Sequence, residues 1–149
     1  MIQRIQTLFL ILAAICFSLL LFLPIKEINV DGQLKTINAL SAFNKDFGYT
    51  ITYSIVSGFI LLGMATAIAS IFSYKQRYLQ IRLCTVIIIL ALVSVMLLNL
   101  TASVEFYGSF ERIPLVSNVI LVLPIVFSYL ATVFIKKDIK LIKSADRLR

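Results

Sequence analysis

The sequence predicts an all-α membrane protein, a four-transmembrane-helix up-down bundle with a small outer loop cap and a basic amphipathic C-terminal helix. Hydrophobic residues make up 60% of the 149 residues and charged residues only 14%, whereas soluble domains are about 45–50% apolar. Such a chain cannot cover its core with polar surface, so the composition favours the membrane class. The charged residues also leave four long uncharged runs between them, and the basic ones gather at the ends of those runs.

The four uncharged runs are each long enough to cross a bilayer. A helix needs about 20 apolar residues to span a hydrocarbon core of about 30 Å, and the shortest run has 21 residues. Helices satisfy their own backbone hydrogen bonds in lipid, and the runs show no alternation of period two that would indicate a barrel. We expect a single domain, residues 1–149, with spans at about 5–24, 51–73, 83–104 and 113–135.

The first and second runs need closer definition. The first follows Arg4 but is longer than the roughly 7–15 apolar residues of a signal peptide and has no A-x-A cleavage site after it. We therefore predict a retained membrane anchor. The second run has tyrosines at both ends, which suit membrane interfaces, so its span is expected nearer 51–72.

The basic residues predict the orientation of the chain. Four spans place both termini on one side, and 10 of the 14 basic residues fall on that side. The excess of Lys and Arg in cytoplasmic segments therefore predicts that both termini are cytoplasmic. In this topology residues 26–46 form an outer loop and residues 136–149 a cytoplasmic tail.

The tail has an amphipathic pattern. On a helical wheel five basic residues fall on one half, with apolar residues on the other. A basic amphipathic helix can contact anionic lipid headgroups or dock on a partner, and it can also serve only as a solvated topology signal. The candidate contact residues are Lys136, Lys137, Lys140, Lys143 and Arg147.

The outer loop contains the dipeptide Asp31-Gly32 between short β-prone segments, which indicates a hairpin. A two-residue turn would pair Val30 with Gln33 and misalign the apolar residues. We therefore expect a three-residue connection that pairs Val30 with Leu34. Residues 38–43 are candidates for a short interfacial helix.

The sequence lacks the groups that most membrane chemistry requires. The four runs contain no ionisable residue that could form a proton relay or ion pathway. The chain has no histidine, no phosphate-binding loop and no acidic metal cluster, and Cys16 and Cys84 lie far apart. The net charge of +7 is confined to short segments rather than spread over a face, so nucleic acid is not an expected partner. We expect a protein that is not an enzyme and has no cofactor or metal.

Two asparagines are the most polar residues inside the predicted spans. Asn99 lies near the outer end of the third span and Asn118 near the outer end of the fourth, so both reach a similar depth at about 1.5 Å per residue. We predict an interhelical hydrogen bond between the two amides. The alternative is a polar notch for a ligand headgroup.

Small residues recur along the second span at helical spacing. Such residues let helices approach closely, either within one chain or between subunits, and the sequence leaves both options open. The candidate packing residues form two groups. Ser54, Gly58, Ala65 and Ala69 share one face, and Gly63 and Ala67 form a second pair.

Three segments resemble a known family. The opening MIQRIQTLFL, the middle LQIRLC and the closing KSADRLR are similar to a bacterial family of small four-span integral membrane proteins catalogued as a domain of unknown function. The resemblance covers the whole chain and implies a protein of the bacterial inner membrane. It implies no activity or cofactor.

These observations lead to two functional hypotheses. The first is a non-catalytic accessory or scaffolding subunit of an inner-membrane complex, in contact with another membrane protein or with itself. The alternative is a small transporter, channel or lipid-binding protein that works as an oligomer.

Overall fold

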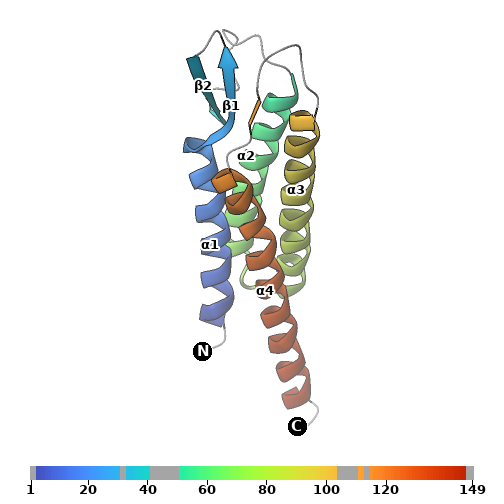
Figure 1. Ribbon diagram of the computed structural model, residues 1–149. Coiled ribbons are helices and arrows are strands. Elements are labelled where there is room, and N and C mark those ends of the chain that lie inside the picture. The colour runs from blue at the N-terminus through green and yellow to red at the C-terminus, as the bar shows by residue number, and fades with distance from the viewer. Residues whose placement is uncertain (1–2, 31–32, 41–50, 104–110, 113–114, 147–149) are drawn as a thin grey trace.

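Four helices run side by side in a computed structural model that describes residues 3–30, 33–40, 51–103, 111–112 and 115–146 (Figure 1). Successive helices run in opposite directions, which confirms the expected up-down bundle of a membrane protein. The start of α1 and the end of α4 lie at one end, here called the terminal end; the strands lie at the other, the sheet end. The helices are α1 (Gln3–Phe22), α2 (Ile51–Phe72), α3 (Arg77–Ser103) and α4 (Leu115–Asp146).

The helices form a closed ring in which each packs against two neighbours. Helices α1 and α3 both contact α2 and α4. Residues spaced three or four apart share one helix face, and in α1 this face, with Leu10, Phe17 and Leu20, is almost fully buried. At most 39% of the residues in each span are buried inside the bundle, so most of the apolar surface of each helix faces outward, as contact with lipid requires.

Close aromatic packing joins α1 to both of its neighbours. Lipid is as apolar as a leucine side chain, so helices in a membrane associate through tight packing rather than through the hydrophobic effect. The Phe9 ring stacks between Phe127 and Phe134 of α4, at centroid distances of 6.4 and 5.6 Å. On the other side, the fully buried Phe17 ring lies against Gly63 of α2, where a Cβ atom would come within 2.7 Å of the ring.

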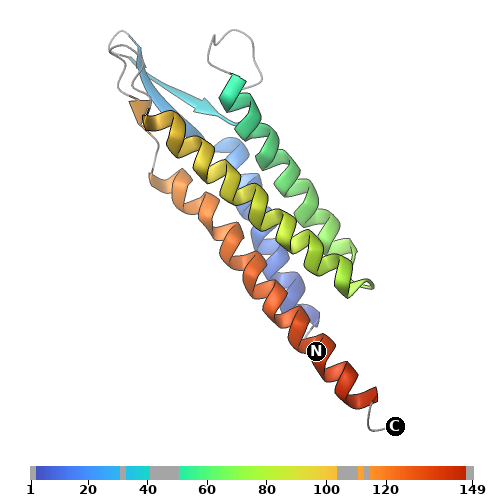
Figure 2. The same cartoon turned by 90° about the vertical axis from the view of Figure 1, so that its right-hand side faces the viewer.

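Two helices extend beyond the apolar runs that predicted them. Helix α3 begins at Arg77, several residues before the expected span at 83–104. Helix α4 continues past Pro124 and is 32 residues long in all, about 48 Å at 1.5 Å per residue. Its last turns project beyond the start of α1 (Figure 2). The described part of the tail is therefore the continuation of α4.

The cap at the sheet end is a three-stranded antiparallel sheet of order β2-β1-β3. Its strands are β1 (Pro24–Val30), β2 (Gln33–Asn38) and β3 (Glu111–Arg112). The expected register of the hairpin is wrong, because Val30 pairs with Gln33 rather than with Leu34. The pairing of β3 with β1 through Glu27 and Arg112 was not predicted.

The physical reason for this register lies at the base of the cap. A hydrophobic pattern fixes strand register only where one face of the sheet is buried. The cap contributes Ile25 and Ala39 to the core, next to a register shift between Pro24 and Lys26, and the Ser117 hydroxyl donates a 2.6 Å hydrogen bond to the Pro24 carbonyl oxygen. The residue pairs farther from the core are therefore not fixed by burial. They adopt the register of a two-residue connection, whose backbone twist matches that of the strands. Of the candidate interfacial helix, Asn38 ends β2, Ala39 and Leu40 form a turn, and residues 41–43 lie outside the described residues.

We predict opposite effects of alanine at the two described glycines of α2. Gly63→Ala forces a methyl group against the buried Phe17 ring and should destabilise the bundle by about 1–3 kcal/mol. Gly58→Ala meets no heavy atom within 4 Å from the rest of the described chain, so it should be neutral or stabilising by up to about 1 kcal/mol. Unfolding in detergent, followed by circular dichroism, measures both. Equal destabilisation by the two variants would contradict this packing.

Candidate functional site

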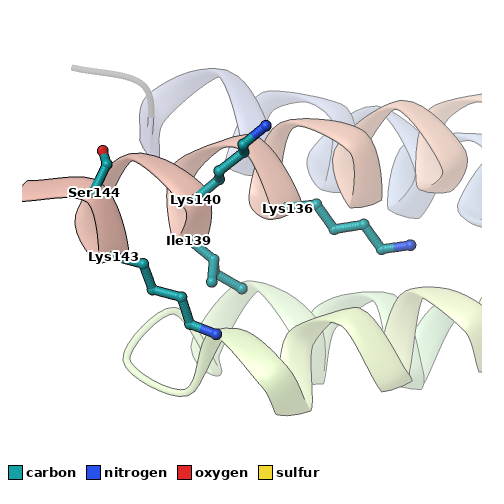
Figure 3. A pocket seen from close by; sticks show the side chains of 5 residues that line it. All are labelled: Lys136, Ile139, Lys140, Lys143 and Ser144. Atoms are coloured by element: carbon teal, nitrogen blue, oxygen red, sulfur yellow. The ribbon is translucent and has the colours of Figure 1, made fainter. Parts of the chain in front are cut away.

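The terminal end of the bundle concentrates the basic side chains. The last turns of α4 and the connection between α2 and α3 lie next to each other there (Figures 1 and 3). Both segments lie at the limit of the apolar spans, where chain and solvent are expected to meet. The seven basic residues whose side chains are described at this end are Lys75, Arg77, Arg82, Lys136, Lys137, Lys140 and Lys143.

A cavity of about 420 Å³ lies beside the end of α4. Figure 3 shows Ile139 and Lys143 pointing toward the α2–α3 connection, whereas Lys140 points away from it. Ile139 also packs against the hydrophobic core, so the cavity has an apolar wall and cationic rims. Its lining residues are Lys136, Ile139, Lys140, Lys143 and Ser144.

A second cavity, of about 520 Å³, lies on the α2–α3 connection. Tyr78 in its lining and the neighbouring Tyr74 are 63% and 56% exposed, which suits residues that meet a membrane interface. The ammonium group of Lys75 lies 6.0 Å from the centre of the Tyr74 ring. The lining residues are Lys75, Gln76, Arg77, Tyr78, Leu79 and Arg82.

An ion pair joins the two segments that carry these cavities. The Arg77 guanidinium lies 2.7 Å from the Asp138 carboxylate, and the two side chains are only 24% and 13% exposed. The two paired atoms have no other hydrogen-bond partner among the described residues. The sequence analysis did not identify this pair. The signal that would have indicated the pair is an acidic residue within a basic segment, at the same depth in the membrane as the cations of the connection between the second and third spans.

The five candidate residues of the tail do not all lie in the same surroundings. Lys136, Lys140 and Lys143 line the α4 cavity, whereas the Lys137 ammonium lies 5.6 Å from the centre of the Phe134 ring. Arg147 lies outside the described residues.

The structure brings Asn99 and Asn118 together. Each side-chain NH2 group donates to the side-chain oxygen of the other at 3.4 Å, which is long for an N–H···O bond. Asn99 also donates to the Val95 carbonyl oxygen at 2.8 Å. The pair therefore joins α3 to α4 near the sheet end through two weak bonds.

The small residues of α2 divide between two surfaces. Gly63 and Ala67 are buried inside the bundle. Ala65 and Ala69 are exposed, Ser54 and Gly58 are half-buried, and a Cβ at Gly58 would meet no atom of the rest of the described chain within 4 Å. The first group packs within the chain, and the second faces outward.

Polar side chains also lie inside the bundle. The Ser70 hydroxyl lies 3.9 Å from the sulfur of Cys84. The amide nitrogen of Gln6 and the hydroxyl of Ser128 are buried without a hydrogen-bond partner among the described residues. The sequence analysis did not single these residues out, although each falls at core-facing spacing in an apolar helix. No grouping of three potential metal-ligating residues occurs in the part of the chain that the structure describes.

Comparison with known proteins gives one match. The model of the family described as "Domain of unknown function (DUF4293)" matches residues 2–148. No curated protein and no solved structure matches the chain.

We predict that the two asparagines are energetically coupled. Asn99→Leu and Asn118→Leu should each destabilise the bundle, and the double variant should cost less than the sum of the two by about 0.6 kcal/mol. A double-mutant cycle of unfolding in detergent measures this coupling. Asn99→Leu combined with Val126→Ala, on the exposed face of α4, serves as the control and should be additive. Additivity of the asparagine variants would show that the 3.4 Å contacts contribute nothing.

Proposed function

The chain belongs to the family described as "Domain of unknown function (DUF4293)", and on that premise we propose that it is a non-catalytic accessory or scaffolding subunit of a bacterial inner-membrane complex. In this proposal the outward face of α2 packs against a transmembrane helix of another protein. The terminal and sheet ends then remain available on the two sides of the membrane.

The observation that carries the proposal is the shape of the α2 outward face. Large exposed residues are frequent on the outward faces of all four helices, and on α2 they include Leu62 and Ile68. On α2 the exposed Ala65 and Ala69 follow the uncovered Gly58, which leaves a shallow strip along the helix. Small residues allow a second helix backbone to approach closely, and the resulting dispersion contacts are what hold membrane helices together.

The sequence supports a non-catalytic role. Ionisable residues within spans mark proton relays and ion pathways, and the uncharged runs 5–25, 47–74, 83–104 and 113–135 contain none. Without such residues in its spans, the bundle would contribute to a complex mainly through its packing surfaces.

We predict that photo-crosslinking will capture a partner at the α2 face. A photoreactive phenylalanine analogue at Ala65 or Ala69, introduced in the native bacterium, should form an adduct with a different membrane protein. The same analogue at Leu92 of α3 or Val122 of α4, both exposed, is the matched control and should react mainly with lipid. Identification of the adduct by mass spectrometry decides the outcome. Equal yields at all four positions would contradict a specific face on α2.

We also infer that both termini are cytoplasmic. The support is the gathering of basic residues at the terminal end, since cytoplasmic segments are rich in Lys and Arg. Cysteine-accessibility mapping in intact cells should leave a cysteine at Ser144 unlabelled by an impermeant reagent. A cysteine at Thr36, which is exposed in β2, should be labelled. The opposite pattern would invert the topology.

The polar interior favours one alternative function. The amide of Gln6 and the hydroxyl of Ser128, which have no hydrogen-bond partner among the described residues, are groups that an oligomeric transporter or channel would use to line a pathway inside each bundle. In that case the crosslinks from Ala65 and Ala69 would join two copies of this chain.

A further inference from the structure

We propose that the terminal end is a two-armed binding site for the phosphate headgroup of an anionic phospholipid. One arm is the end of α4, with Lys136, Lys140 and Lys143. The other is the α2–α3 connection, with Lys75 and Arg82. This inference does not depend on the proposed docking role of α2, because it uses other residues at another place in the bundle.

The two arms are held together by the Arg77–Asp138 ion pair. Segments more than 50 residues apart in the sequence meet at this 2.7 Å contact, which ties the last turns of α4 to the start of α3. Each partner neutralises the other, so the pair positions the arms without using their remaining charges.

Among the described residues, no counter-ion accompanies the remaining cations of the two arms. Asp138 is the one carboxylate at this end whose side chain is described, and Arg77 occupies it. Lys75, Arg82 and the three α4 lysines are exposed, and none has an ion-pair partner in the described part of the chain. Charge complementarity therefore favours an anionic occupant.

The position of the site identifies that occupant as lipid. The apolar span of α2 ends at Phe72, directly before Tyr74 and Lys75, so the connection lies at the height where lipid phosphates are found. Clusters of basic residues next to a transmembrane helix bind anionic headgroups at about this depth. Within the α4 arm, the seven helical steps from Lys136 to Lys143 cover about 10 Å, a length comparable to the headgroup layer.

The mixed lining of the cavities also fits a phospholipid. Ile139 in one cavity and Leu79 in the other lie beside the cations. Leu141 and Ile142 of the same helix are 54% and 42% exposed. A headgroup would contact the ammonium and guanidinium groups while its acyl chains follow the outward faces of the helices.

Native mass spectrometry of the full-length protein tests the proposal. The probes are phosphatidylglycerol and phosphatidylcholine with identical acyl chains, added to the protein in a neutral detergent. We expect phosphatidylglycerol to bind at least about fivefold more tightly than phosphatidylcholine, since each basic residue near a headgroup contributes roughly that factor. Equal binding of the two lipids would overturn the proposal.

Charge-removing variants test each arm separately. K136Q/K140Q/K143Q and K75Q/R82Q should each reduce the preference for phosphatidylglycerol by about fivefold or more. The matched control, K26Q/K35Q/R112Q in the strands of the sheet end, removes the same charge as the first variant and should leave the preference unchanged. Loss of preference in the control as well, or in only one of the two arm variants, would overturn a two-armed site.

Two further measurements make the result unambiguous. Circular dichroism of each variant in detergent should show native helix content, because the side chains replaced in the two arms are exposed and the control replaces residues of the strands rather than of the helices. Inorganic phosphate at millimolar concentration should leave lipid binding largely intact. If phosphate displaced the lipid completely, the occupant would be a free phosphate and the assignment to a phospholipid would be wrong.

Discussion

The constraint on which this structure depends is that backbone polar groups in lipid must find their partners inside the chain. Helices meet this requirement within each segment, but they then have no hydrophobic force that drives them together. The bundle therefore depends on close contacts between side chains. The Phe17 ring against Gly63 and the stacking of Phe9 on α4 supply such contacts on the two sides of α1.

Polar interactions between helices are placed toward the ends of the bundle, where burial costs less. The Asn99–Asn118 pair joins α3 to α4 near the sheet end, and the Arg77–Asp138 ion pair joins the same two helices at the terminal end. A partly buried ion pair of this kind adds little to the stability of the fold, because desolvation offsets much of the attraction between the charges. Its main effect is to hold two segments in a fixed relative position. Here it fixes where the basic end of α4 lies.

The two proposed surfaces, the outward face of α2 and the basic arms, select their partners by different physical interactions. The outward face of α2 lies within the apolar span, where only close packing can distinguish a protein helix from lipid. The basic arms lie at the limit of the spans, where charge selects among headgroups. A subunit that positions a complex in the membrane would use both kinds of contact, and neither requires a catalytic group.

The sequence by itself determined the fold class and the distribution of charge. Uncharged runs longer than about 20 residues leave a chain in lipid no alternative to helices, and four of them joined in order give an up-down bundle. Only the tertiary structure decided how each helix is rotated about its own axis, and thus which of its faces points into the bundle. Helical periodicity states which residues share a face but not which neighbour that face meets. The sequence therefore separated Gly63 and Ala67 from Ala65 and Ala69, but only the structure shows that the first pair lies inside the bundle and the second outside. For the same reason Arg77 and Asp138 could not be paired from the sequence. Strand register also escaped prediction, because only the base of the cap is buried and its distal residues are not constrained by the core.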